Sequence, residues 1–375
     1  MILLVAVIFP LSCTKNSTSS GKPKNFQAFE SSIFQREIRI LTINVWSGLT
    51  YKGFFKMGRY PDNLQGRYEL LVSEIRKLAP DIIAIQEANL LPHYAKRLAK
   101  DLDYEVIYRV ALGGIRFGSL GIPTNMREGQ AILVKKPWTI EDLDKKRLGG
   151  QGIATNWLCL HFGEITQALL GRVVIHGRLL YVYNVHLHEG PFKGSVLEAM
   201  FKRLAQEMTT EKLEEARKAI EKDIERRKVE IANLIKFVEE TLPPDMPAII
   251  LGDFNTTSES GELEPLFAGG KWVDSFRFKN THEEGVTWDP KHNPNYRPAE
   301  IVKDPYGTLH AYHGSHPYRI DFILVNNHVP HDHILESRVV MTPMHGLAPS
   351  DHYGVLTILR WRSRDYTLNQ RRSRP

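Results

Sequence analysis

The sequence contains a series of short apolar runs, each about as long as one β-strand, and polar residues follow most of them. These runs span residues 38–45, 81–86, 131–134, 179–185, 248–251, 320–325 and 355–359. They are rich in Ile, Val and Leu, which is typical of strands whose sheet is covered on its faces. Between some runs, apolar residues recur at helical spacing, most clearly over residues 68–78, where Pro80 ends the pattern. This alternation predicts an α/β fold.

Length and composition favour one large domain. The chain has 375 residues, of which 42% are hydrophobic and 25% charged, as in an ordinary folded protein. Its two cysteines exclude a disulfide framework and a thiolate zinc site. No internal repeat is apparent. We therefore expect a catalytic domain over residues 36–360, preceded by a signal-like segment (1–13) and a flexible tether (14–35) and followed by a basic tail (361–375).

The start of the chain resembles an export signal. Residues 2–9 are uninterrupted apolar, which is too short to span a bilayer but has the length of a signal-peptide core. Ser12 and Cys13 follow, as at a bacterial lipoprotein processing site. We expect an exported protein that is either anchored through a lipid on Cys13, at the outer surface or in the periplasm, or secreted.

Positive charge is concentrated at the two ends of the chain. The formal net charge is +6, of which residues 360–375 carry +5 and residues 1–25 carry +3, which leaves −2 for residues 26–359. A basic tail can attract an anionic membrane or a nucleic acid. The slightly acidic body, however, gives no indication of a nucleic-acid groove.

Two further segments bear on substrate access. Residues 193–225 are highly charged and favour a helical insert, with one apolar face that includes Met200 and Phe201. That face either packs on the domain or contacts a membrane or a partner. Residues 112–125 are Gly-rich and apolar, and we expect a loop at the rim of the substrate site or at a membrane.

Six groups of polar residues lie at or near strand ends. A single residue of this kind is usually a turn residue, but six together indicate that the strand ends converge on one cleft or metal. The residues are Asn44, Glu87, Asn184 with His186, Asp253 with Asn255, Asp321, and Asp351 with His352.

Hydrolysis of a phosphoester requires this set of side chains. A hard divalent cation prefers carboxylate and amide oxygens, which Glu87 and Asn44 offer. A carboxylate or histidine can activate the attacking water, and neutral or cationic donors such as Asn255 and His186 can stabilise the oxyanion. His188 could form a chelating pair with His186, although on a strand the second residue of such a pair more often flanks the cleft.

The same residues carry a resemblance to a known family. Leu41–Val45, Ile85–Glu87, Tyr183–Leu187, Leu251–Asn255, Arg319–Ile323 and Ser350–Tyr353 resemble the ordered motifs of the endonuclease/exonuclease/phosphatase superfamily. The strongest motifs are Gly-Asp-Phe-Asn and Ser-Asp-His. The resemblance implies a four-layer α/β sandwich, with two facing mixed sheets and outer helices. It also implies Mg²⁺-dependent attack of water on a phosphoester, with Mn²⁺ or Ca²⁺ as alternative metals.

The resemblance further implies a role for each site residue. Glu87 resembles the main metal ligand, with Asn44 beside it and Asp351 as a further metal or water-orienting acid. Asp253 resembles the residue that orients or deprotonates the water, and Asn255 the transition-state donor. The remaining catalytic residues are His352 as general acid/base, Asp321 as the carboxylate that orients it, and His186 as a second catalytic imidazole.

The segment before the Asp321 strand indicates a branch of the superfamily. Thr287, Trp288 and Asp289, followed by Asn293 and Tyr296, resemble a segment of the sphingomyelinase-like branch. The expected substrate contacts are Asn184, Trp288 and Tyr296.

We therefore expect a monomeric phosphodiesterase that acts on a phospholipid, of sphingomyelinase or phospholipase C type, with contact to a membrane surface. The main alternative is an exported nuclease acting on a nucleic acid. A small-molecule phosphatase and a non-catalytic binding module remain further alternatives.

Overall fold

The computed structural model describes residues 35–362, except for residues 47–48, 53–55, 60–63, 119, 123–125, 162 and 298–303. The predicted signal segment with Cys13, the tether as far as residue 34 and the basic tail from residue 363 lie outside the described residues. Within the described ranges, no helix combines the length and the apolar character needed to cross a bilayer.

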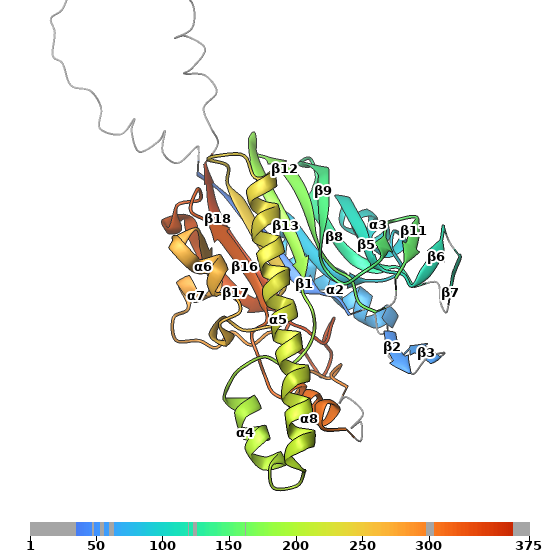
Figure 1. The fold of residues 1–375 in the computed structure, drawn as a ribbon. Helices are drawn as coiled ribbons and strands as arrows, with labels where there is room; N and C mark the ends of the chain where they lie inside the picture. Colours follow the sequence, from blue (N-terminus) through green and yellow to red (C-terminus); the bar gives the residue numbers. More distant parts are fainter. Residues whose placement is uncertain are drawn as a thin grey trace, which may run out of the picture. The chain divides into compact units, whose positions relative to one another are not determined.

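Two six-stranded sheets form the centre of the domain (Figure 1). The first sheet has the strand order β17 (Ile334–Val340), β18 (Gly354–Arg362), β1 (Gln35–Asn44), β4 (Ile82–Ala88), β8 (Glu128–Lys135) and β5 (Tyr104–Leu112). The second has the order β15 (Trp272–Asp274), β16 (Asp321–Asn326), β14 (Ala248–Asp253), β13 (Arg178–His186), β12 (Thr166–Ile175) and β9 (Thr139–Gly149). Both are mixed, since β1 pairs parallel with β4 and β13 with β14, while β4 pairs antiparallel with β8 and β14 with β16.

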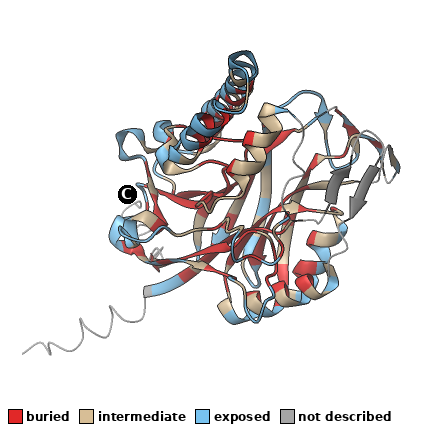
Figure 2. Cartoon of the chain, turned by 90° about the horizontal axis from the view of Figure 1, so that it is seen from below, coloured by how far each residue is buried: buried red, intermediate tan, exposed pale blue. Residues whose placement is uncertain are grey.

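Each sheet is covered on both faces, which explains why the apolar runs do not alternate with polar residues. In β4, Ile82 and Ala84 lie in the core between the sheets, whereas Ile83 and Ile85 face α2 (Leu64–Leu78) and α3 (His93–Leu102). The second sheet packs in the same way under the later part of α5 (Thr210–Thr241) and α6 (Glu264–Phe267). These layers confirm the predicted four-layer sandwich, and the strands are mostly buried (Figure 2).

Smaller elements surround the sandwich. A four-stranded sheet has the order β10 (Ile153–Ala154), β11 (Leu158–Leu160), β6 (Ile115–Phe117) and β7 (Leu120–Ile122), and β2 (Leu49–Lys52) pairs with β3 (Lys56–Arg59). The predicted Gly-rich loop therefore contains two strands. The short helices are α7 (Ser275–Lys279), α8 (Pro305–Gly314) and the 3-10 turns Ser258–Ser260, Ala268–Gly270 and His331–His333.

The predicted helical insert forms α4 (Ser195–Leu204) and the first half of α5, which continues without a break to Thr241. Its apolar face packs inward: Met200 is 5% exposed and Phe201 4%, in a cluster with Ile220 and Leu309 of α8. The alternative in which this face contacts a membrane is therefore wrong, because the residues already pack against α5 and α8.

Candidate active site

The sheet registers place the predicted site residues next to one another. In the second sheet, His186 of β13 lies opposite Asp253 of β14, which in turn lies opposite Asp321 of β16. In the first sheet, Asn44 at the end of β1 pairs with Gln86, directly before Glu87. Residues from five strands therefore meet at one end of the sandwich.

Asn44 joins the two sheets at this point. Its side-chain nitrogen donates to Glu87 Oε1 at 2.8 Å and to Asp253 Oδ2 at 3.0 Å. Its side-chain oxygen accepts from the backbone N–H of Trp46 at 3.0 Å. An amide oxygen has a second lone pair, so the prediction that Asn44 is a metal ligand stays a prediction. Its nitrogen holds the two carboxylates in place.

Glu87 is set apart from its strand by local backbone geometry. Its φ of 52° is left-handed, and the pairing of β4 with β8 shifts register between Ile85 and Ala88. A bulge of this kind re-aims a side chain. Burial raises the pKa of the Glu87 carboxyl above its ordinary value.

The turn after β14 fixes Asp253. Gly252 has a φ of +139°, and a Cβ there would lie 2.0 Å from the carbonyl oxygen of Val185, so this position requires glycine. Asp253 Oδ1 accepts the backbone N–H of Asn255 at 2.9 Å. The Asn255 side chain donates to the carbonyl of Leu187 at 2.9 Å and lines the same cavity as Asp253.

His352 and Asp321 form a buried pair. The two groups meet at 2.9 Å, between His352 Nδ1 and Asp321 Oδ2, and His352 Nε2 lies 3.8 Å from Asp253 Oδ2. Burial alone would lower the pKa of His352, but the carboxylates of Asp321 and Asp253 hold it well above its usual value. The indole of Trp288 lies against the imidazole of His352, with ring centroids 5.1 Å apart.

His186 faces the same carboxylates from β13. Its Nε2 lies 3.7 Å from Asp253 Oδ2 and 3.8 Å from Glu87 Oε1. Burial opposes its protonation, yet Asp253 and Glu87 outweigh burial and raise the pKa of His186. Asp351 lines the cavity nearby, and burial raises its pKa to about 7.

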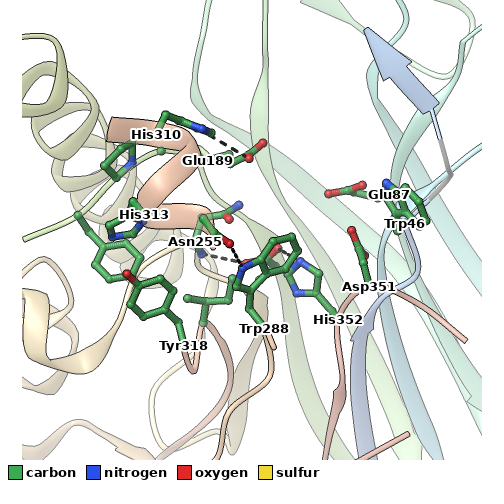
Figure 3. A pocket seen from close by; sticks show the side chains of 16 residues that line it. Trp46, Glu87, Glu189, Asn255, Trp288, His310, His313, Tyr318, Asp351 and His352 are labelled. Carbon is green, nitrogen blue, oxygen red and sulfur yellow. Dashed lines mark hydrogen bonds and ion pairs between the residues drawn. The ribbon is translucent and has the colours of Figure 1, made fainter. Parts of the chain in front are cut away.

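A cavity of about 250 Å³ opens onto these groups (Figure 3). Glu87, Trp46 and Asp351 lie on one side of it, and His310, His313 and Tyr318 on the other. The predicted residues on its lining are Glu87, Asp253, Asn255, Trp288, Asp351 and His352.

Several cavity residues were not predicted. His310 and His313 come from α8, and Phe192 from the loop after β13. The imidazole of His313 stacks on Tyr318 with centroids 4.7 Å apart, and burial lowers its pKa to about 3, which keeps it neutral. The His-x-x-His spacing of α8 was a signal, but no strand end marked it as part of the site.

Two polar residues of the Thr-Trp-Asp segment support the catalytic loops. The Thr287 hydroxyl accepts the backbone N–H groups of Ile320 and Asp321. The Asn293 amide donates to the carbonyl of Asp351 at 2.8 Å. These residues position the Asp321–His352 pair without lining the cavity.

Asn184 and Tyr296 do not reach the cavity lining. Asn184 is fully buried, donates to the carbonyls of Ile85 and Ala131, and accepts from Gln86 at 2.7 Å. The prediction of a substrate contact for Asn184 is therefore wrong, because its amide joins the two sheets. Tyr296 contacts the ring of Trp288, with centroids 5.7 Å apart, so it can affect the substrate only through Trp288.

His188 turns away from His186. It lies between Glu164 and Asp223 of α5, with Nε2 3.1 Å from Asp223 Oδ1. A chelating pair with His186 is therefore absent.

The site offers donors that suit a divalent cation. Ligand atoms of Glu87, His186 and Asp253 lie within 4.8 Å of one another, and a second such group comprises Asp253, Asp321 and His352. Among the described residues that line the cavity, none is Lys or Arg. Arg67, which lies outside the lining, lowers the pKa of Asp351, but burial outweighs this effect. Carboxylates in this setting fit Mg²⁺ or a similar hard ion.

The profile of the Endonuclease/Exonuclease/phosphatase family matches residues 41–352. The chain belongs to this family. Members of the family are phosphoester hydrolases that typically depend on a divalent metal, in agreement with the carboxylate and imidazole site. No curated protein sequence matches the chain.

Solved structures share the fold at low identity. TDP2 of D. rerio in complex with single-strand DNA product has a TM-score of 0.54 and 17% identity, covering 86% of this chain and 98% of that one. TDP2 of C. elegans has a TM-score of 0.54 and 15% identity, covering 90% and 81%. A family protein of Leptotrichia buccalis has a TM-score of 0.53 and 16% identity, covering 86% and 100%. These similarities establish the fold alone, and the sphingomyelinase-like branch stays a prediction.

Proposed function

We propose that this protein is an exported, Mg²⁺-dependent phosphodiesterase that hydrolyses the headgroup ester of a phospholipid. The observation that carries the proposal is the make-up of the cavity. One side holds the catalytic carboxylates and the imidazole of His352, the other is aromatic and largely neutral, and no described lining residue is Lys or Arg. A nuclease needs cations to contact the phosphate backbone of its substrate, whereas a lipid headgroup needs only one phosphate site.

The positions of the side chains support the following catalytic steps. A metal held by Glu87 and Asp351 would neutralise charge on the phosphate oxygens and lower the pKa of a bound water. Asp253, held on both carboxylate oxygens by Asn44 and Asn255, orients the attacking water.

Proton transfer and charge stabilisation involve the remaining groups. His186, which lies beside Glu87 and Asp253, donates to a phosphate oxygen. His352 gives its proton to the leaving alkoxide, while Asp321 keeps the imidazole in the required orientation.

The rim of the cavity favours a headgroup with a cationic end. Trp46, Phe192, Trp288 and Tyr318 supply aromatic rings, and Glu189 adds a carboxylate. Aromatic faces attract quaternary ammonium groups. We therefore expect sphingomyelin and phosphatidylcholine to be cleaved faster than phosphatidylglycerol.

A hydrolysis panel tests the proposal. Purified protein with Mg²⁺ is incubated with vesicles of sphingomyelin, phosphatidylcholine, phosphatidylglycerol or phosphoinositides, and separately with supercoiled DNA. We expect release of a phosphorylated headgroup that EDTA abolishes and that Asp253→Ala or His352→Ala reduces by at least about a thousandfold. Tyr296→Phe is the control, because Tyr296 does not line the cavity. Nicking of DNA without any headgroup release would refute the lipid substrate and support the nuclease alternative.

A further inference from the structure

The small sheet of β10, β11, β6 and β7 exposes apolar side chains on one face and buries polar groups on the other. Across its register, Ile153 lies opposite Leu160 and Leu160 opposite Ile115, which forms one row. A second row comprises Leu158, Phe117 and Leu120. Opposite residues of antiparallel strands share a face. We call this surface the apolar face; its exposed members are Ile115, Phe117, Leu120, Ile153 and Leu160, with Trp157 in the turn.

The apolar face is accessible rather than packed. Leu120 is 76% exposed, Phe117 63% and Trp157 57%, and the rings of Phe117 and Trp157 contact each other with centroids 4.1 Å apart. Figure 1 shows β6, β7 and β11 to the right of β5, away from α5. A contiguous exposed patch of this kind marks an interaction surface.

The opposite face of the same sheet contains the polar groups. Arg116 is buried, and its guanidinium donates to the carbonyls of Gly118, Asn156 and Thr155. The Gly118 N–H donates to the carbonyl of Trp157 at 2.8 Å. Backbone carbonyls at the tip are therefore bonded within the protein, which lowers the cost of moving the tip into an apolar medium.

The two segments that build the sheet contain basic residues and no acidic ones. Residues 106–127 include Arg109, Arg116 and Arg127 and no acid, and residues 145–163 include Lys145, Lys146 and Arg147 and no acid. Phospholipid surfaces present phosphate groups above hydrocarbon. Of these cations, Arg116 is buried, Arg109 pairs with Asp142 and Lys146 pairs with Glu240, which leaves Arg127, Lys145 and Arg147 at the base of the apolar tip. An apolar tip with an aromatic pair and these cations at its base matches that order of layers.

The face is also continuous with the catalytic site. A narrow cavity lined by Glu87 and His186 extends to Ala111 and Leu112 at the end of β5, directly before this sheet. A surface docked at the apolar face therefore lies beside the catalytic end of the sandwich.

We infer that the apolar face inserts into the outer part of a phospholipid bilayer and docks the enzyme on its substrate surface. The choice of lipid over another apolar partner rests on the proposed function. A protein partner at the same face is the competing outcome that the experiment separates.

The test compares Leu120→Glu and Phe117→Ser with Val229→Glu, all in the full chain. Val229 is 56% exposed on α5, so the control introduces the same charge at an exposed apolar residue away from the apolar face. Co-flotation with phosphatidylcholine vesicles, with and without phosphatidylglycerol, measures binding. The N-terminal segment is common to all variants, so its contribution cancels in the comparison.

We expect both apolar-face variants to weaken vesicle binding at least about tenfold and Val229→Glu to leave it unchanged. Turnover of a short-chain lipid below its micelle concentration should be unchanged in all three. Trp157 is the one exposed tryptophan of the six, and brominated lipid should quench its fluorescence in the wild type.

Other outcomes decide between the two proposals. Vesicle binding that depends on Leu120 without hydrolysis of any lipid would support the apolar face and refute the lipid phosphodiesterase. If the wild type hydrolyses lipid and Leu120→Glu binds and hydrolyses vesicles equally well, the membrane contact is refuted and the lipid phosphodiesterase is not. A changed oligomeric state in Leu120→Glu with unaltered vesicle binding would overturn it in favour of a protein interface.

Discussion

His352 is held on two sides of its ring, and each contact limits a different freedom. The hydrogen bond from Nδ1 to Asp321 sets which nitrogen faces the cavity, and the Trp288 indole limits rotation of the ring. Trp288 itself is fixed, because its Nε1 donates to the carbonyl of Gly314 at 2.8 Å. At the scale of single residues, catalysis depends on such constraints as much as on the reacting groups.

Asp321→Asn should lower kcat by about a hundredfold to ten-thousandfold with little change in KM, because an amide no longer stabilises the imidazolium. Steady-state kinetics on the best lipid of the panel measures the effect. An unchanged kcat would exclude Asp321 as the partner of a catalytic His352.

His188 makes folding stability depend on pH. Its contacts with Asp223 and Glu164 outweigh burial and raise its pKa to about 9, above the ordinary value for histidine. A raised pKa stabilises the fold fully below the unfolded-state pKa, and the stabilisation is lost as pH rises through the folded-state value. The contribution is at most about 3 kcal/mol.

His188→Gln should therefore lower the melting temperature near pH 6 and have little effect above pH 9. Thermal unfolding across that range, compared with the wild type, measures the difference. A difference that does not change with pH would contradict the pairing of a charged His188 with Glu164 and Asp223.

At the scale of elements, α5 links the core to the wall of the cavity. Arg227 of α5 is fully buried and forms a two-pronged ion pair with Glu262. The same guanidinium donates to the carbonyls of His188, Gly190 and Pro191, so one side chain shapes the loop that carries Phe192. Because α5 is one continuous helix, it connects the apolar cluster of α4 and α8 with the loop that carries Phe192.

Arg227→Met should destabilise the protein by about 3–5 kcal/mol, because it leaves the Glu262 carboxylate buried without a partner. The double variant Arg227→Met/Glu262→Met should recover part of this lost stability, because no unpaired charge remains. KM should be raised in both variants, because the loop carbonyls have lost their donor. Urea unfolding and kinetics measure the two effects. Equal destabilisation of the single and double variants would exclude an unpaired charge as the cause.

At the scale of the whole molecule, the two sheets bring several acids to one end of the sandwich with few compensating charges. The pKa values of Glu87, Asp321 and Asp351 are all raised by burial, which indicates stored repulsion and desolvation. A cation that binds only the folded state offsets this cost.

Mg²⁺ or Mn²⁺ should therefore raise the melting temperature by a few degrees at saturating concentration, and EDTA should reverse the change. Glu87→Gln should remove the response to metal, yet melt at or above the wild type in metal-free buffer, because it neutralises a half-buried carboxylate whose pKa is raised. A full metal response in Glu87→Gln would show that the ion binds elsewhere.

The predicted elements agree with the structure where strands are buried on both faces and miss a strand that is only partly buried. All seven apolar runs are strands, because residues buried on both faces must be apolar regardless of distant contacts. By contrast, β9 lies at a sheet edge and reads Glu-Asp-Leu-Asp-Lys-Lys, which hid it from the sequence pattern. The predicted helical insert also ended at residue 225, whereas α5 continues to Thr241.

The sequence by itself determined the α/β alternation, the order of the motifs and the residue types of the site, since strand burial and residue type are local properties. The four-layer sandwich was implied by the resemblance that those motifs carry. Only the tertiary structure decided which polar groups meet. It assigned Asn184 to a link between the sheets, turned Asn44 toward the carboxylates, and brought α8 to the cavity. It also decided that Met200 is buried and Leu120 exposed, because an apolar pattern shows that a face exists but not whether another element covers it.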